Sequence, residues 1–533
     1  MSKVRGMVAC PEPEAAEVGA GILERGGTAA DAGVATAFAQ TVANPLISSL
    51  GGCGGFLMYD ARRGAAEVVE AYAMSGSRAA VGVYTAMEGG EIPGIVGGGR
   101  KVEGGRNMRT HAASTIPTLV RGLEEVHRRH GRLPWKDLVE PAARLARDGI
   151  VVTPYLYRTW DPDRTHPDGM GIPEKIEDEP EARKIFMPRG RFLRLGETLV
   201  QRDLARTLDR IASEGPQVFY EGEIGGMIGR DFETHGGLFT ADDLRGARPS
   251  IGIPLRVRYR DWTLVTDGPP TLGIILLQIM QILEGVDLRA LGWNTPGYVD
   301  LVARTMQSAF VDATTVLGAQ TNGAAARLLD PSRVAALRAR VLAGEAPGRR
   351  EGFASDGTTH LAAVDADRNV VSWVHSSGSG SGVVTPGLGF VHNNHMIMFD
   401  PRPGGPQTIA PRTIPVHGGG PVIVERDGRP LMAIGSPAGG LKTTAITQVL
   451  LNMFEFGLPL QAAISAPRIH TDAGRGIMVE PSFPSGLRRT LQRLGHQMVI
   501  SEYTARISAV MITDDGGLIG GADPRGGGGL EWC

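Results

Sequence analysis

The stretch SDGTTHLAAVDADRNVVSW, residues 355–373, sets a Gly-Thr-Thr-His motif directly before two apolar segments that are joined by the polar sequence DADR. Two segments of strand length with a short polar turn between them predict a β-hairpin. Cleavage of the backbone before Thr358 would leave a threonine whose own α-amine can act as the base for its hydroxyl. Gly357 suits such a cleavage, because a residue without a side chain tolerates strained backbone geometry. The alternative is that the motif forms an ordinary turn into the first strand.

The chain differs in character before and after this motif. Helices are predicted over much of the first part, at residues 11–24, 28–42, 116–148, 199–245 and 271–345. After Thr358 strands dominate, one of them over residues 389–399, with helices at about 441–457 and 485–494. The polar segment 342–357, which contains glycine and proline, is predicted to be an exposed linker at the boundary.

Composition narrows the class of function. The 533 residues are 42% hydrophobic and carry a formal net charge of −2, without a basic tract that would indicate nucleic-acid binding. Three cysteines give no disulfide framework, and the N-terminal segment has no apolar core of a signal peptide. The longest apolar run, residues 274–283, is too short to cross a bilayer. We therefore expect a cytoplasmic enzyme that acts on a small molecule, with neither nucleic acid nor membrane as a partner.

Two further motifs resemble a nucleotide site and a metal site, but neither of them predicts such a site. The glycine-rich sequence LGGCGGF, residues 50–56, precedes a strand instead of opening a helix, and no Lys-Ser/Thr pair follows it, so it does not predict a nucleotide site. The His-x-x-His pair His392 and His395 falls in the predicted strand 389–399. Residues i and i+3 of a strand face opposite sides, so joint metal ligation is not expected. The sequence predicts no cofactor and no metal.

Longer motifs recur in a fixed order along nearly the whole chain, from about Gly6 to Gly528. They include GGTAADAGVATAFAQTVANP (26–45), LGGCGGF (50–56), GGLFTADDL (236–244), TTHLAAVDADRNVVS (358–372), GSPAGG (435–440) and GGADPRGGG (520–528). In order and spacing they resemble the gamma-glutamyltranspeptidase family of N-terminal nucleophile hydrolases. The resemblance implies an α+β fold, a four-layer αββα sandwich made as one precursor. That precursor would cut itself into a large subunit, residues 1–357, and a small subunit, residues 358–533, and the resemblance leaves open whether two such heterodimers pair.

The resemblance also assigns catalytic roles. It makes Thr358 the nucleophile, with the cleavage site between Gly357 and Thr358, and makes Ser376 the hydroxyl that supports the nucleophile. Thr359 follows the nucleophile as in the family and is assigned to the substrate site. The GSPAGG loop matches the family's oxyanion loop, in which the backbone N–H groups of Ala438 and Gly439 would stabilise the oxyanion, a contribution of about 3–4 kcal/mol per donor. Alanine at position 438 departs from the family's glycine.

The part of the family pattern that binds the γ-glutamyl group is not kept. The family holds that group with an arginine and two serines on its carboxylate, and with an aspartate on its amine. At the matching positions this chain has Tyr72 for the arginine, His417 and Gly418 for the serines, and Met398 for the aspartate, with His395 at a neighbouring polar position. Methionine cannot pair with a buried ammonium, and an unpaired one costs several kcal/mol. Glutathione is therefore not the expected substrate.

Polar residues of other kinds stand in that region. Four histidines, His375, His392, His395 and His417, could help Tyr72 to hold a carboxylate or a polar amide, or they could be structural polar groups. Arg412 and Arg525 are cations close to the motifs, and Arg525 is expected to be a structural ion-pair partner.

Three functions follow from these patterns. The favoured one is a self-processing amidohydrolase that passes the acyl group of a small amide to water or to an amine. The acyl group would be oxamate-like, as in cytoplasmic family members, or that of a cephalosporin or glutaryl acylase. The second is an orthodox gamma-glutamyltransferase or glutathione hydrolase with substitutes in its glutamyl site. The third is an unprocessed, non-catalytic binding protein, which has no need for the retained Thr358, Ser376 and oxyanion loop.

Overall fold

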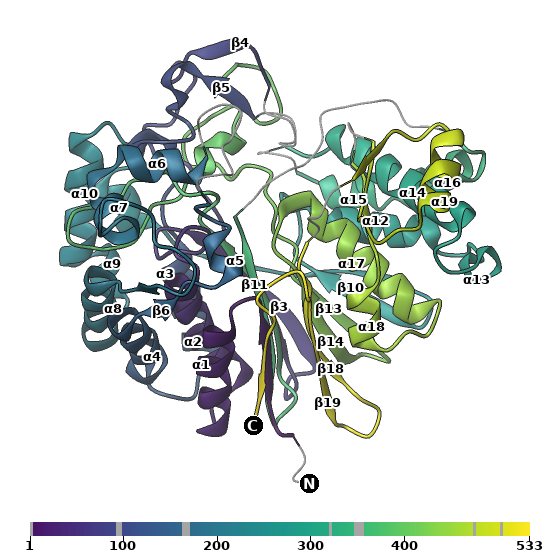
Figure 1. Cartoon of the computed structure of the whole chain (residues 1–533), viewed down its shortest axis with the longest axis horizontal. Coiled ribbons are helices and arrows are strands. Elements are labelled where there is room, and N and C mark those ends of the chain that lie inside the picture. The colour runs from purple at the N-terminus through teal and green to yellow at the C-terminus, as the bar shows by residue number, and fades with distance from the viewer. Residues whose placement is uncertain are drawn as a thin grey trace.

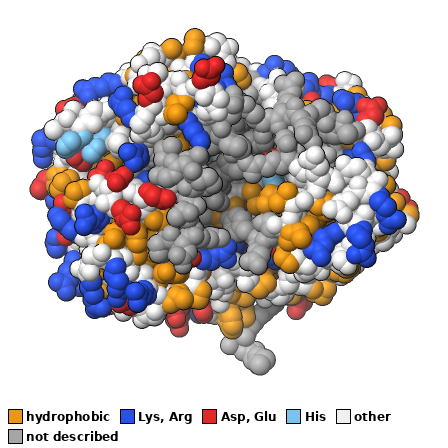
Figure 2. Space-filling model, turned by 45° about the horizontal axis from the view of Figure 1, so that its top comes forward, with side chains coloured by type: hydrophobic (Ala, Val, Ile, Leu, Met, Phe, Trp, Pro, Cys, Tyr) orange, Lys and Arg blue, Asp and Glu red, His pale blue; other side chains and the backbone are white. Residues whose placement is uncertain are grey.

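The computed structural model describes residues 4–91, 99–161, 171–318, 322–345, 357–472, 476–500 and 505–533. Two antiparallel sheets pack face to face between two layers of helices (Figure 1). The predicted α+β architecture, a four-layer αββα sandwich, is confirmed. Charged side chains of both signs are interspersed over the described part of the face drawn in Figure 2. Among the described residues, no helix combines the length and the apolar character needed to cross a bilayer.

The first sheet contains the predicted hairpin at its centre. In spatial order its strands are β20 (Gly529–Trp532), β1 (Met7–Cys10), β11 (Thr359–Val364), β12 (Val370–Ser376), β2 (Cys53–Asp60), β3 (Ala65–Ala71) and β8 (Ser250–Gly252). Within the hairpin Thr359 pairs with His375, and Val364 pairs with Val370. This register places Thr358 next to Ser376, at the end of the sheet where β12 stops.

The second sheet covers one face of the first. Its order is β19 (Leu518–Ala522), β18 (Ser508–Ile512), β14 (Arg429–Gly435), β13 (Val422–Arg426), β10 (Trp262–Thr266) and β9 (Leu255–Tyr259). Alternate residues of β11 face its two sides, as the period of a strand requires. Ala362 and Val364 lie in the core between the sheets, whereas Leu361 and Ala363 pack among the helices.

The helical layers have separate cores. The core beside the first sheet includes α1 (Pro13–Glu24), α2 (Ala29–Ala43), α3 (Leu119–His130), α4 (Trp135–Asp148) and α8 (Arg202–Glu214). The core beside the second includes α12 (Gly273–Leu283), α14 (Pro296–Thr314), α16 (Pro331–Leu342), α17 (Gly439–Phe454) and α18 (Leu460–Ser465). Every residue of α2 is buried, and a capping box between Thr28 and Asp31 starts the helix. Its small residues permit close packing, since a Cβ on Gly33 would lie 2.5 Å from the ring of Trp373.

Shorter elements complete the chain. The remaining helices are α5 (Pro154–Tyr157), α6 (Ile172–Asp178), α7 (Pro180–Phe186), α9 (Gln217–Tyr220), α10 (Glu223–Thr234), α11 (Ala241–Gly246), α13 (Leu288–Leu291), α15 (Ala324–Leu328) and α19 (Ser485–Arg493), with 3₁₀ turns η1 (Glu103–Gly105), η2 (His111–Ala113) and η3 (His395–Met398). The remaining strands are β4 (Ala86–Glu91), β5 (Arg100–Val102), β6 (Ile150–Val151), β7 (Thr198–Leu199), β15 (Ile469–His470), β16 (Ile477–Val479) and β17 (Met498–Ile500).

One predicted strand is wrong. Residues 389–399 form a loop that ends in η3, with only single bridge contacts at Val391 and His392. The side chain of Asn393 takes up backbone groups that a strand would pair, since its Nδ2 donates to the carbonyl oxygens of Gly51 and Thr115. Such side-chain bonds compete with a sheet ladder.

The helices predicted after Thr358 are present, but the sequence did not reveal all of them. The one predicted at 441–457 corresponds to α17, and the one at 485–494 to α19; the short helix α18 was missed. In the predicted linker 342–357, residues 346–356 lie outside the described residues.

Candidate active site

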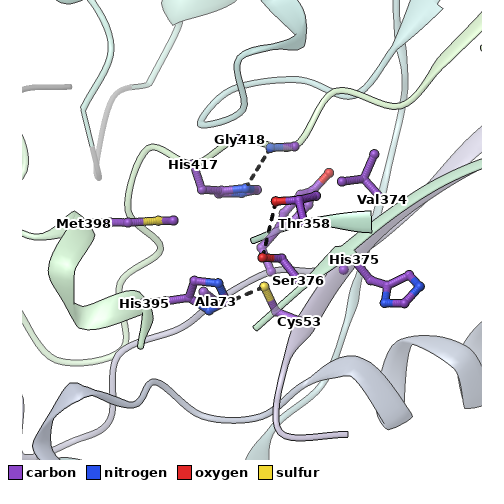
Figure 3. Close-up of a pocket in the computed structure, with 13 residues that line it drawn as sticks. Cys53, Ala73, Thr358, Val374, His375, Ser376, His395, Met398, His417 and Gly418 are labelled. Atoms are coloured by element: carbon purple, nitrogen blue, oxygen red, sulfur yellow. Dashed lines mark hydrogen bonds between the residues drawn. The ribbon is translucent and has the colours of Figure 1, made fainter. Parts of the chain in front are cut away.

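A pocket lies at the end of the first sheet where β11 and β2 begin and β12 stops (Figure 3). The structure brings together residues that the sequence places far apart, and those predicted for the site that line the pocket are Tyr72, Thr358, Ser376, His395, Met398, His417 and Gly418. Thr359, Ala438 and Gly439 are not among the described lining residues.

Ser376 contacts both groups that would react in a self-cleavage before Thr358. The hydroxyl of Thr358, a residue only 6% exposed, donates to Ser376 Oγ at 3.4 Å. Ser376 Oγ in turn donates to the carbonyl oxygen of Gly357 and accepts the N–H of Gly378 at 2.8 Å. The serine hydroxyl therefore links the attacking hydroxyl to the carbonyl that would be attacked, and a hydrogen bond to that oxygen favours charge developing on it.

Gly357 occupies a position that only glycine fits. Its φ is +97°, and a Cβ there would lie 1.7 Å from the carbonyl oxygen of Gly378. A side chain would thus meet fixed backbone in addition to adopting a left-handed φ. The motif leads directly into β11, and the close approach of Gly357 to Gly378 holds the bond before Thr358 against the loop that follows Ser376.

Thr359 lies on the opposite face of β11 from the pocket. Its hydroxyl accepts a hydrogen bond from Gln40 Nε2 at 2.8 Å and lies 3.0 Å from Glu12 Oε2. Burial raises the pKa of Glu12, although hydrogen bonds from Gln40, Asn44 and Thr359 oppose that rise. The assignment of Thr359 to the substrate site is not supported by this placement, because successive residues of a strand point to opposite sides.

His375 belongs to the same network behind the sheet. Its Nε2 lies 2.8 Å from Gln40 Oε1, and its Nδ1 lies 3.0 Å from Ser48 Oγ. Burial lowers its pKa to about 3, so the ring is neutral. In Figure 3 the ring points away from Thr358 and Ser376. His375 is among the lining residues of the pocket, but its ring serves as a structural polar group of this network.

The His-x-x-His pair does not share a ligand position. His392 lies 3.0 Å from Thr385 Oγ1 through its Nε2, whereas His395 contacts Cys53 Sγ at 3.8 Å through its Nδ1. Burial lowers the pKa of both rings, to about 3 for His392 and about 4 for His395. Only His395 lines the pocket.

Tyr72 is tied to an acid that the sequence did not reveal. Its hydroxyl donates to Asp267 Oδ2, and the ring of Tyr72 lies 4.1 Å from that of His417, centroid to centroid. Asp267 also accepts from Thr271 Oγ1 at 2.6 Å and from the N–H of Gly420 at 3.0 Å. Burial raises the pKa of Asp267, and these hydrogen bonds oppose the rise. The one available signal was an aspartate at the end of a strand, before Gly-Pro-Pro.

The GSPAGG loop adjoins the pocket wall without lining the pocket. Ala438 precedes α17 with a left-handed φ of +84°, a conformation that is uncommon for a residue other than glycine. Alanine therefore keeps the backbone shape expected of glycine at this position. A Cβ on Gly418, which lines the pocket, would lie 3.2 Å from the Cα of Gly439.

The two arginines near the motifs are held by acids. Arg412 contacts Asp243 at 3.2 Å. Arg525 contacts Asp523 at 3.0 Å and also pairs with Glu480, so the predicted structural role is confirmed.

A group outside the pocket could hold a metal ion. His111, Asp231 and His235 offer ligand atoms that lie within 4.8 Å of one another. Asp231 Oδ1 is 3.2 Å from His111 Nε2 and 3.0 Å from His235 Nδ1, so the two imidazoles already pair with the carboxylate. None of the three lines the pocket of Thr358.

Comparison with known proteins places this geometry in a family. A model of the family described as gamma-glutamyltranspeptidase matches residues 15–532. The glutathione hydrolase proenzyme of Escherichia coli (strain K12) is 29% identical over 545 residues, which cover 98% of this chain and 90% of that protein. The acylase ACY 1 proenzyme of Pseudomonas sp. (strain SE83) is 32% identical over 529 residues, covering 97% and 92%. The crystal structure of a cephalosporin acylase from Bacillus halodurans matches with a TM-score of 0.86 at 26% identity, covering 99% of this chain and 96% of that one.

Proposed function

Because the chain belongs to the gamma-glutamyltranspeptidase family of N-terminal nucleophile hydrolases, we propose that it matures by cutting itself between Gly357 and Thr358. The mature enzyme then hydrolyses a small amide whose acyl group lacks the α-amine of a γ-glutamyl group. The observation that carries the first step is the contact of Ser376 Oγ with both the Thr358 hydroxyl and the Gly357 carbonyl oxygen. Relatives that are named proenzymes support it.

In the self-cleavage, Thr358 Oγ1 attacks the carbonyl carbon of Gly357. The C–N bond breaks as the nitrogen takes a proton, which leaves Gly357 as an ester on the threonine hydroxyl. Water hydrolyses that ester, giving a carboxylate on Gly357 and a free α-amine on Thr358. Ser376 donates its hydrogen bond to the carbonyl oxygen, where negative charge develops.

In turnover, the new α-amine accepts the proton of Thr358 Oγ1 as the hydroxyl attacks the substrate amide. The backbone N–H groups of Ala438 and Gly439 stabilise the oxyanion. The amine product leaves with the proton, and water or a second amine takes the acyl group from the threonine ester.

The class of acyl group follows from the pocket wall. Where an α-ammonium would need a carboxylate, the wall offers Met398, with His395 beside it, and no carboxylate stands among the described lining residues. A buried ammonium without an acid costs several kcal/mol. The acylase relatives support an acyl group of another kind. The competing function, γ-glutamyl transfer or hydrolysis, has the glutathione hydrolase relatives in its favour.

Two measurements test this proposal. Intact mass under denaturing conditions should give two fragments that meet between Gly357 and Thr358 in the wild type, and a single chain in Thr358→Ala. The cleaved protein is then assayed on glutaryl-p-nitroanilide and γ-glutamyl-p-nitroanilide, which differ only by the α-amine. We expect the glutaryl compound to be the better substrate. Faster turnover of the γ-glutamyl compound would establish the competing function, and an uncleaved wild type would favour a binding protein.

A further inference from the structure

Two buried hydrogen-bond donors beside the pocket have no partner among the residues that the structure describes. Lys442, in the first turns of α17, is 1% exposed, and its Nζ makes no hydrogen bond with any described residue. The Nε2 of His417, which lines the pocket, is likewise buried without a partner in the described part of the chain. Leaving a buried donor unsatisfied costs about 1–3 kcal/mol, and more for a charged group. Each such atom therefore needs an explanation.

The protonation of His417 follows from its other nitrogen. The N–H of Gly419 donates to His417 Nδ1 at 3.2 Å, and a ring nitrogen that accepts a hydrogen bond carries no proton. Burial, aided by the charge of Lys442, lowers the pKa of His417 to about 3, so the ring is neutral near pH 7. The single proton must then sit on Nε2. His417 thus presents an N–H that has no acceptor among the described residues, and Lys442 presents an amino group that is an ammonium below its pKa of about 7.

Lys442 is not among the described lining residues of the pocket, but its Nζ lies close to Gly418, the neighbour of His417 in the sequence. This glycine lies in the pocket wall, and a Cβ placed on it would lie 3.9 Å from Lys442 Nζ. No side chain at position 418 therefore stands between the pocket and the ammonium. Gly439 of the GSPAGG loop lies against the same glycine, with its Cα 3.2 Å from that Cβ position. The donors are hence close to the loop that would stabilise the oxyanion.

The nearby acid does not occupy these donors. Asp267 is the residue whose charge acts on Lys442, but its carboxylate oxygens accept hydrogen bonds from Tyr72, Thr271 and Gly420. It compensates the charge of the ammonium without making a hydrogen bond to it. An anion that enters from the pocket would supply the missing acceptors.

We propose that Lys442 Nζ and His417 Nε2 form a subsite for the far carboxylate of the acyl group, so that the substrates are half-amides of short dicarboxylic acids. This inference rests on the proposed function and names its substrate class. Oxamate and glutaryl amides both belong to that class. Met398 on another part of the wall accommodates the apolar carbon chain.

The experiment compares two amides of equal length on the mature protein. Glutaryl-p-nitroanilide carries the carboxylate, and pentanoyl-p-nitroanilide has a methyl group in its place. We expect the wild type to prefer the glutaryl compound in kcat/KM by at least about 100-fold, the scale of a buried, hydrogen-bonded charge pair. In Lys442→Met that preference should vanish through a loss on the glutaryl compound, with kcat/KM for the pentanoyl compound changed by less than about 3-fold. Arg412→Met, which removes an exposed cation paired with Asp243, is the control and should keep the preference.

Each other outcome has a definite meaning. Equal turnover of the two amides by the wild type would overturn the subsite while leaving the proposed hydrolase intact. Equal losses on both amides in Lys442→Met would show that the lysine acts on the reaction at Thr358 instead. If Lys442→Met fails to fold or to cut itself, the subsite is tested instead by inhibition of the wild-type reaction on pentanoyl-p-nitroanilide. Glutaramate should then inhibit at concentrations at least about tenfold lower than pentanamide, which has a methyl group in place of the carboxylate, and equal inhibition would overturn the subsite. If the proposed function itself is wrong, the chain will stay uncut and will have no activity on any of these amides.

Discussion

Two groups of buried polar side chains, one on each side of the hairpin β11–β12, differ in whether their hydrogen-bonding atoms have partners. Behind it, Thr359 and His375 meet Gln40, Glu12 and Ser48 in a network in which each of these side chains has a partner. In front of it, the donors of two other buried side chains, His417 and Lys442, have no partner in the described part of the chain. Buried groups that the protein pairs hold its own structure together, whereas buried groups left unpaired beside a pocket indicate what the pocket binds. Four changes test this contrast.

The largest effect is expected at Thr358, the proposed nucleophile on the pocket side. Thr358→Ala should abolish self-cleavage and turnover, because no hydroxyl remains to attack the Gly357 carbonyl. Thr358→Ser keeps a hydroxyl and should retain part of both. Intact mass and the rate on glutaryl-p-nitroanilide measure the two effects. An uncut Thr358→Ala protein with full activity would rule out the mechanism.

The next largest effect is expected at Gly357, which precedes the bond proposed to be cut. Gly357→Ala should slow self-cleavage by at least about 100-fold, since a Cβ 1.7 Å from the Gly378 carbonyl oxygen displaces the bond from Ser376. The control is Gly428→Ala, at another glycine with positive φ (+74°) but with no atom within 4 Å of the added Cβ. A time course of fragment formation on denaturing gels compares the two. Cleavage of Gly357→Ala at the wild-type rate would show that the close approach of Gly357 to Gly378 has no part in the reaction.

A smaller effect should come from pH. Burial lowers the pKa of Lys442 to about 7, so its ammonium loses its proton as the pH rises through that value. The groups that act on it are Asp267, His360 and His417, and both histidines, with pKa values of about 3, stay neutral across this range. The preference for glutaryl over pentanoyl amide in kcat/KM should therefore fall from below pH 7 to above it. Taking the ratio would cancel the titration of the α-amine that the proposed cut leaves on Thr358, because that amine would act on both substrates. A ratio that stays flat from pH 6 to 9 would contradict a charged Lys442 in binding.

The smallest effect is expected behind the hairpin. Thr359→Val removes a hydroxyl between Gln40 and Glu12 and should lower stability by about 1–3 kcal/mol without changing KM. Thermal inactivation and substrate saturation curves report the two quantities. A raised KM at unchanged stability would place Thr359 in the substrate site after all.

The local motifs made the hairpin and one wall of the pocket predictable from the sequence. A turn followed by two short apolar segments predicted β11 and β12, and the motif order predicted that Thr358, Ser376 and His417 belong to one site. The role of His375 could not be predicted from the sequence, because it depends on which face of β12 the ring occupies and on Gln40, which is distant in the sequence.

Two residues beside the pocket were missed for a related reason. Asp267 and Lys442 come from β10's end and from α17, and neither stands in a recognisable pattern. What marks Lys442 is the absence of a hydrogen-bond partner in the described part of the fold, and a sequence does not display that. The loop at 389–399 was mistaken for a strand because its apolar residues outweighed two asparagines whose side chains bind the backbone.

The proposed cut would divide the chain into two pieces that both contribute strands to each sheet. The first sheet interleaves β1, β2, β3 and β8 from before Gly357 with β11, β12 and β20 from after it, and the second sheet is mixed in the same way. The two pieces would remain threaded together after the bond is broken, and they could part only by unfolding. Reassembly would then require two molecules to meet, where the precursor needed one. Unfolding of the mature enzyme would therefore not be readily reversible. The lifetime of the active enzyme would be set by the rate at which it first unfolds.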